Sequence, residues 1–274
     1  FGQYKKLTNR FDGVLTGKDR LWGGSLVRKE ATGYGCVYFA EHMLKGHQNS
    51  LEGKECLVSG SGNVAIYTIE KLLELGAKPV TCSDSGGTIY QKSGIDVKSL
   101  KQIKEVEQGR LTDYAERHPD AEYIGRNRYP DDGHAVWRFA GQVAFPCATQ
   151  NELTAADAKA LLDNGCIAVC EGANMPCTAD AAEVFLTAKI AYAPGKAANA
   201  GGVATSQLEM AQNASMQHWS FEEVDQKLKD IMQGIYQRTS ETAAELDQPA
   251  NFILGANVAG FRRVADAMIQ QGVV

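Results

Sequence analysis

The chain has 274 residues, of which 44% are hydrophobic and 22% charged, and its formal net charge is -5. This composition is typical of a globular protein with a sizeable core, and the charge gives no electrostatic bias toward nucleic acid. The uncharged stretch at residues 197–208 is too short and too polar for a membrane span, and residues 1–13 lack the apolar segment of a secretory signal. We therefore expect a cytoplasmic protein that binds neither nucleic acid nor membrane.

Seven cysteines are scattered through the chain, most of them inside apolar runs. They form no CxxC pair, and no histidine stands at metal-ligand spacing. The sequence therefore predicts buried free thiols rather than disulfides or a metal site.

The first part of the chain alternates between helical and strand patterns. Apolar residues in 31–45 recur at helical spacing, and residues 54–59 form a short apolar run that predicts a buried strand. Residues 63–76 are again periodic and end at a glycine, as a helix does. Residues 78–84 predict a second strand.

The second part repeats this alternation. Three apolar runs at 141–150, 166–176 and 190–202 each end in a polar, glycine-rich turn, and residues 154–165 predict a helix between the first two. Residues 118–138 are polar and broken by Pro and Gly, which predicts a long surface excursion.

Charged helical patterns close the chain, at 221–246 and 258–271, with a loop between them at 247–251. Strands that alternate with helices predict an α/β fold, a Rossmann-like, doubly wound and mostly parallel sheet with helices on both faces, followed here by C-terminal helices. Ligands bind such sheets where the strands end, so the turns after the strands are the expected place of function.

A glycine turn follows the first predicted strand. Gly60, Gly62 and Ala65 form G-x-G-x-x-A between that strand and the next helix. The first glycine permits a tight turn, the second lets a diphosphate approach the backbone, and the small third residue lets helix and strand pack closely. The pattern predicts a dinucleotide site, and the residues expected to contact the cofactor are Gly60, Ser61, Gly62, Asn63 and Val64.

Asp84 and Ser85 stand at the end of the second predicted strand. An acid at this place binds the ribose 2′-hydroxyl and favours NAD, because it repels a 2′-phosphate. A hydroxyl beside it can donate to a phosphate instead. The residues alone therefore leave the choice between NAD and NADP open.

Several phrases together go beyond a generic nucleotide fold. They are EATGYG at 30–35, GSGNVA at 60–65, PCATQNEL at 146–153, EGANMP at 171–176 and APGKAANAGGVATSQLEMAQN at 193–213. With them the chain resembles, over essentially its whole length, the small hexameric glutamate dehydrogenases, particularly the NADP-type branch.

The resemblance implies reversible, NAD(P)-dependent oxidative deamination of L-glutamate to 2-oxoglutarate and ammonia, in a homohexamer. It also implies a domain organisation. Residues 1–29 would be a remnant of the substrate domain, residues 30–205 the dinucleotide-binding domain, and residues 206–274 helices that return to the substrate domain. The chain begins with Phe, and we expect it to be the C-terminal portion of a longer protein.

Further site residues follow from the resemblance by position. Thr32, Ala148, Thr149, Asn151 and Asn174 would complete the cofactor site. Gly202, Val203 and Ser206 would contact substrate, with Ser206 donating to the side-chain carboxylate where a leucine or phenylalanine dehydrogenase presents apolar surface. Without the resemblance, Ser206 would be interpreted as a helix cap.

The family's lysine-rich substrate motif, catalytic lysine and catalytic aspartate would lie upstream of the first residue. Lys196, in a glycine-rich turn, is not in a matching context. Acid–base chemistry at the reacting carbon needs a group within hydrogen-bond reach. We therefore expect the chain to hold the cofactor but to have negligible turnover by itself.

The resemblance favours NADP, with NAD possible. NADP-type relatives often carry basic residues after the second strand, where this chain has Glu107 and Gln108, although Lys101, Lys104 and Arg110 are available. Two alternatives remain: another amino acid dehydrogenase of the superfamily, specific for leucine, phenylalanine or valine, or a catalytically inert nucleotide-binding fragment.

Overall fold

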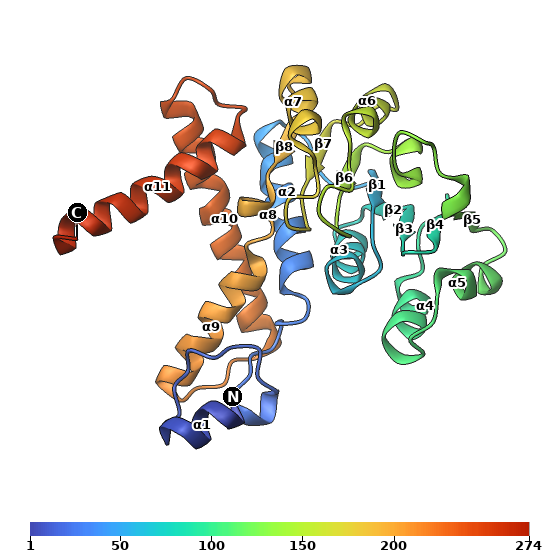
Figure 1. Ribbon diagram of the computed structural model, residues 1–274. Coiled ribbons are helices and arrows are strands. Elements are labelled where there is room, and N and C mark those ends of the chain that lie inside the picture. The colour runs from blue at the N-terminus through green and yellow to red at the C-terminus, as the bar shows by residue number, and fades with distance from the viewer. Residues whose placement is uncertain (274) are drawn as a thin grey trace.

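In a computed structural model, residues 1–273 form a parallel sheet covered by helices, a second small sheet beside it, and a group of long helices on the other side (Figure 1). None of the helices in this range is both long enough and apolar enough to cross a bilayer. All seven cysteines are buried and free, as the sequence predicts.

The central sheet has five strands in the order β2-β1-β6-β7-β8, and all neighbouring pairs are parallel. The carboxyl ends of the strands meet at one edge, because Val58 pairs with Phe145 and Cys170 pairs with Ala193. The predicted parallel sheet is confirmed. The strands are β1 (Glu55–Val58), β2 (Lys78–Pro79), β6 (Val143–Phe145), β7 (Ala168–Cys170) and β8 (Ala191–Ala193).

Helices cover both faces of this sheet, as predicted. On one face α2 (Ala31–Gly46) and α3 (Asn63–Glu74) belong to the larger apolar core, and on the other α6 (Ala155–Asp163) and α7 (Ala179–Ala188) form the smaller one. Alternate strand residues point to opposite faces and so enter different cores. The strand residues in the smaller core are Leu57, Ala144, Val169 and Tyr192.

A second, antiparallel sheet of the order β3-β4-β5 was not expected. The single strand predicted at 78–84 is two strands, because the chain leaves the parallel sheet after Pro79 and pairs with β4 instead. The strands are β3 (Thr81–Ser83), β4 (Gly87–Tyr90) and β5 (Glu122–Gly125), and between the last two lie α4 (Val97–Lys101), the short helix η2 (Gln102–Val106) and α5 (Leu111–Arg117).

The prediction that residues 118–138 form a long surface excursion is wrong in part, because Ile124 and residues 135–137 are buried. The segment contains β5, the short helix η3 (Arg126–Arg128) and the short helix η4 (Ala135–Arg138). Trp137 of η4 is fully buried in the smaller core. One buried aromatic in a polar stretch has no periodic signal, which explains the error.

The long helices pack on one another beside the sheet. The helix α10 (Phe221–Glu245) contacts α2, α9 (Gly201–Ser215) and α11 (Phe252–Gln271). The predicted helix at 258–271 begins earlier, at Phe252, because the Asn251 side chain caps it by accepting from the Leu254 amide. Figure 1 shows α11 extending away from the body. The domain boundary expected after residue 205 falls inside α9.

The first residues lie against the far end of α9 (Figure 1). They include α1 (Gly2–Thr8) and the short helix η1 (Arg20–Trp22), and a further short helix, α8 (Gly195–Ala198), precedes α9. The Nζ atom of Lys18 lies 2.7 Å from Oε1 of Glu209, and both side chains are buried. The Gly17 amide also donates to Glu209, so one carboxylate holds this segment to α9.

Glycines allow α2 to approach its neighbours closely. A Cβ atom on Gly33 would lie 2.6 Å from the Thr68 amide of α3, and one on Gly201 would lie 2.0 Å from the Ala31 carbonyl oxygen. No side chain fits at either place, because backbone atoms cannot yield as flexible side chains do. These contacts fix where α3 begins relative to α2 and α9.

Candidate functional site

Two neighbouring cavities open at the carboxyl edge of the parallel sheet, where the sequence predicts the site. The larger has a volume of about 840 Å³ and the smaller about 530 Å³. They share Val64, in the first turn of α3, and Cys147, Ala148, Thr149 and Gln150, in the turn after β6. Together they form an elongated cleft of the kind that holds a dinucleotide.

The glycine turn forms one wall of the larger cavity. Gly60 has φ +85°, and a Cβ atom there would lie 3.1 Å from the Cys147 carbonyl oxygen. A Cβ atom on Gly62 would meet nothing within 4 Å, and no side chain caps the N-terminus of α3 that follows. The first-turn amides of α3 and its dipole are therefore available to an anionic diphosphate.

Asp84 lies at the same cavity, but its carboxylate is already engaged. Oδ1 accepts from the amides of Gly86 and Gly87, at 2.8 and 3.2 Å. Oδ2 accepts from the Leu111 amide at 3.2 Å and lies 3.5 Å from Nζ of Lys104, and only 7% of the side chain is exposed. The charge that would repel a 2′-phosphate is thus largely compensated within the protein.

Ser85 is exposed next to Asp84 and accepts a hydrogen bond from Nη1 of Arg110, at 2.9 Å. Arg110 and Lys104 therefore stand close to the end of β3, as the sequence allowed. Lys101 does not, because it pairs with Glu70 of α3. A guanidinium that reaches a serine hydroxyl at this edge is a ready partner for a phosphate.

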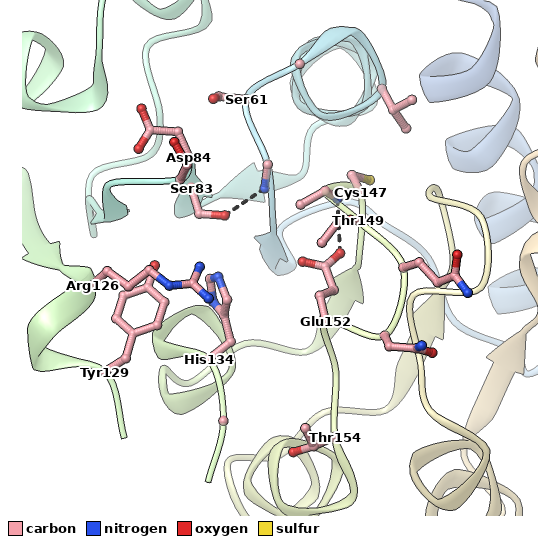
Figure 2. A pocket seen from close by; sticks show the side chains of 18 of the residues that line it. Ser61, Ser83, Asp84, Arg126, Tyr129, His134, Cys147, Thr149, Glu152 and Thr154 are labelled. Carbon is pink, nitrogen blue, oxygen red and sulfur yellow. Dashed lines mark hydrogen bonds between the residues drawn. The ribbon is translucent and has the colours of Figure 1, made fainter. Parts of the chain in front are cut away.

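The opposite side of the larger cavity is formed by residues of the segment 118–138, which we predicted to be a surface excursion. Arg126, Tyr129 and His134 point into the space facing Ser83 and Asp84 (Figure 2). The His134 ring packs edge-on to Tyr129, with 4.6 Å between the ring centroids, and its Nδ1 accepts from the Val136 amide. Burial lowers the pKa of His134 to about 4, so this imidazole is neutral at pH 7. No local pattern signalled these three residues.

The smaller cavity gathers residues that the resemblance assigned to nicotinamide and substrate. Thr32, Asn174, Gly202 and Val203 line it. Ser206 is not among its lining residues. Its hydroxyl donates to the Gly202 carbonyl oxygen at 3.0 Å, in the second turn of α9. The helix-cap interpretation of Ser206 is therefore wrong, because the residue lies inside the helix.

Asn151 lines the larger cavity with a left-handed backbone, φ +54°. Its amide donates to the Met175 carbonyl oxygen at 3.0 Å, which ties the turn after β6 to the turn after β7. In the second of these turns, Oδ1 of Asn174 accepts from Nδ2 of Asn199 at 2.8 Å. The structure thus brings all the predicted cofactor residues to one edge of the sheet.

Sequence reasoning missed Arg28. It is the only cation that lines the smaller cavity in the described part of the chain. Its Nη1 atom lies 3.8 Å from the place where a Gly202 Cβ atom would be, and its buried Nε atom has no hydrogen-bond partner within the protein. The signal that could have found it is the basic pair Arg28 and Lys29 directly before the phrase at 30–35.

Sequence reasoning also missed Glu152, whose carboxyl group points into the larger cavity (Figure 2). Oε1 accepts from the Ser59 hydroxyl at 2.8 Å and from the Ala148 amide at 3.0 Å. Burial raises the pKa of Glu152 to about 7 although these donors favour its ionised form. This carboxyl group therefore titrates near neutral pH.

No lysine or aspartate lines the smaller cavity within residues 1–273. Lys196 donates to Asn257 of α11 at 2.6 Å. This part of the chain also contains no cluster of three or more His, Cys, Asp or Glu side chains that could hold a metal ion. The cleft can bind and orient a dinucleotide, and acid–base groups for carbon–nitrogen chemistry would have to come from elsewhere.

Comparison with known proteins agrees with this geometry. The chain is 65% identical over its whole length to the NADP-specific glutamate dehydrogenase of Helicobacter pylori and 55% identical to the NAD(P)-specific glutamate dehydrogenase of Xylanibacter ruminicola. It covers 61% of the first protein and 60% of the second.

Among solved structures, glutamate dehydrogenase from Plasmodium falciparum superimposes with a TM-score of 0.94 at 46% identity, covering 99% of this chain and 57% of that one. The model of the glutamate/leucine/phenylalanine/valine dehydrogenase family matches residues 23–272. Because that match takes in both cavities and the sheet edge between them, the chain belongs to the glutamate/leucine/phenylalanine/valine dehydrogenase family.

Proposed function

We propose that this chain supplies the cofactor-binding part of a glutamate dehydrogenase, which interconverts L-glutamate with 2-oxoglutarate and ammonia by NAD(P)-dependent hydride transfer. The observation that carries the proposal is the continuous cleft at the edge of the sheet, with the uncapped N-terminus of α3 where its two cavities meet and Arg28 in the smaller cavity. The similarity to glutamate dehydrogenases over the whole chain supports it.

The cofactor we propose is NADP, with NAD as a weaker ligand. The diphosphate would lie at the glycine turn, Gly60 to Val64, and the nicotinamide end near Thr32, Thr149 and Asn174. The compensated charge of Asp84 and the Ser85–Arg110 contact support a 2′-phosphate at the end of β3. The cofactor itself supplies the hydride chemistry, and these residues hold it in place.

The substrate we propose is a dicarboxylate. Arg28 beside Gly202 and Val203 would attract a carboxylate, which a leucine or phenylalanine side chain lacks. The Ser206 hydroxyl would contribute only by exchanging its present bond to Gly202 for one to substrate. Because no acid–base group lines this cavity in residues 1–273, we expect the chain by itself to bind cofactor without appreciable turnover.

The domain limits at residues 29 and 205, the hexamer and the cytoplasmic location stay predictions. An inert nucleotide-binding fragment and a branched-chain or aromatic amino acid dehydrogenase are the competing interpretations. Arg28 weighs against the second of them, since an apolar substrate side chain gives its buried Nε atom no partner.

Calorimetric titration with NADPH and NADH, each with and without 2-oxoglutarate, tests the proposal. We expect NADPH to bind more tightly than NADH. Equal binding of the two would contradict the 2′-phosphate site, and binding of neither would contradict the cofactor site itself. Cofactor reduction driven by L-glutamate at the rate of a whole glutamate dehydrogenase would contradict the expected lack of turnover.

A further inference from the structure

Glu152 joins the turns that form the cofactor cleft. Its Oε1 atom accepts from the Ser59 hydroxyl after β1 and from the Ala148 amide after β6. The Ser59 hydroxyl in turn accepts from the Cys147 amide at 2.8 Å. On the other side, Leu153 forms a bridge to Cys177, after β7. One carboxyl group thus connects the ends of neighbouring strands directly beneath the site.

The second oxygen of this carboxyl group has no partner. Oε2 of Glu152 is buried and makes no hydrogen bond within the protein. A buried carboxylate oxygen without a donor is unfavourable, and protonation removes the charge that this oxygen would otherwise carry. The geometry therefore favours the neutral acid.

Among residues 1–273, Arg126 is the one cation that lines the same cavity as Glu152, and the other surrounding groups do not offset the charge of Glu152. Asp157 of α6 raises its pKa further, and the thiols of Cys147 and Cys177 have pKa values raised well above the usual range by burial, so they stay neutral. The charged or titratable groups that face it across the larger cavity are Asp84, Arg126, Tyr129 and His134. Among them Asp84 is paired with Lys104, and His134 is neutral at pH 7.

We propose that Glu152 takes up a proton from solvent when the nicotinamide cofactor binds, and that the neutral carboxyl group then holds the turn after β6 against the glycine turn. The inference rests on the cofactor site proposed above. The diphosphate would place negative charge at Gly60 to Val64, one residue beyond Ser59, and an added anion favours the neutral form of a nearby acid. No bond of the cofactor changes, and the proton moves only from buffer to Glu152.

The number of protons taken up can be measured directly. NADH is titrated into the chain at pH 7 in two buffers of different ionisation enthalpy, and the difference in observed heat gives the proton count. NADH is the better probe because it lacks a 2′-phosphate, which itself titrates near pH 6. We expect uptake of about half a proton, and binding about fivefold weaker at pH 8 than at pH 7.

The variant Glu152→Gln keeps the shape of the side chain and cannot titrate. We expect it to bind NADH with no proton uptake and with an affinity that is constant between pH 7 and pH 8. Glu183→Gln is the matched control. Glu183 is exposed on α7, so this variant makes the same chemical change far from the cleft. The control should behave as the unmodified chain does.

A second variant tests the inference even if Glu152→Gln does not fold. Ser59→Ala removes a donor that favours the ionised form, so the pKa of Glu152 rises, less proton is taken up at pH 7, and the fall in affinity moves to higher pH. A merely structural role of Glu152 would not shift a pH profile in this way.

The outcomes separate this inference from the proposed function. Binding of NADH without proton uptake, or uptake that persists in Glu152→Gln, would overturn the role of Glu152 and leave the cofactor site standing. Failure of the unmodified chain to bind either NADH or NADPH would overturn both. If Glu152→Gln does not fold, an unchanged pH profile in Ser59→Ala would overturn the inference.

Discussion

The ammonium group of Lys104 lies 3.5 Å from the carboxylate of Asp84. An acid at the end of this strand would ordinarily select NAD, because it binds the 2′-hydroxyl and repels a 2′-phosphate. Here two backbone amides of the following turn occupy one oxygen, and Lys104 with the Leu111 amide occupies the other. Asp84 therefore stabilises the turn after β3, and we expect the groups beside it to select between NAD and NADP.

Arg110 is the group whose removal should change the preference most. We expect Arg110→Met to weaken NADPH binding by about 10- to 100-fold, the equivalent of one charged hydrogen bond, and to leave NADH binding within about twofold. Parallel calorimetric titrations with the two cofactors measure this. Arg238→Met, on the exposed side of α10, is the control. An equal loss for both cofactors would show that Arg110 does not act on the 2′-phosphate.

His134 should make the fold sensitive to acid. Its pKa falls from 6.5 to about 4 on burial, so the unfolded chain binds more protons between these values and stability is lost as the pH drops through that range. The full contribution is about 3 kcal/mol. We expect His134→Asn to lose less stability than the unmodified chain between pH 7 and pH 4.5 in urea unfolding. The same loss in both would contradict the prediction, and exposed His47→Asn is the control.

The buried Lys18–Glu209 pair should contribute strongly to stability. We expect Lys18→Met to lower the free energy of unfolding by about 3–5 kcal/mol, because it leaves the Glu209 carboxylate buried with only backbone donors. Lys45→Met, which breaks the more exposed pair of Lys45 with Glu41 in α2, should cost only about 0.5 kcal/mol. Similar losses for both variants would be incompatible with this interpretation.

The close approach of α2 to α3 can be tested with alanine. Gly33→Ala should destabilise the fold by about 1–3 kcal/mol and weaken cofactor binding, because the added methyl group meets the Thr68 amide and the Val64 carbonyl oxygen in α3. Gly234→Ala, in the middle of α10 with open space around it, should stabilise by about 0.5–1 kcal/mol. Both are measured by chemical unfolding, and binding by calorimetry. Unchanged cofactor affinity in folded Gly33→Ala would contradict the second effect.

The sequence predicted most of the parallel sheet, because every strand of it except β2 lies in a short apolar run that ends in a turn. The glycine turn was found for a similar reason: it joins a strand to the helix that follows directly in the sequence, and Gly60 there has a positive φ. Signals of this kind are local, so they survive without knowledge of the fold.

The residues that were missed depend on contacts between distant segments. Arg28 and His134 enter the site because helices and turns far apart in sequence meet at the sheet edge. The engagement of Asp84 by Lys104 and Leu111 joins segments 20 or more residues apart. Hydrophobic periodicity does not predict contacts between distant segments. The sequence also does not show whether a charged residue next to a strand is paired with an opposite charge in the fold.

The chain changes sheets between Pro79 and Thr81, so the two ends of the cleft stand on different sheets. The half that would read the 2′-position stands on the small antiparallel sheet and the helices after it, whereas the half that faces the smaller cavity stands on the parallel sheet and α2. We therefore expect that substitutions within residues 81–138 that spare the core residue Trp137 can change nucleotide preference without altering the smaller cavity. Nucleotide preference and substrate binding can thus be changed separately by mutation.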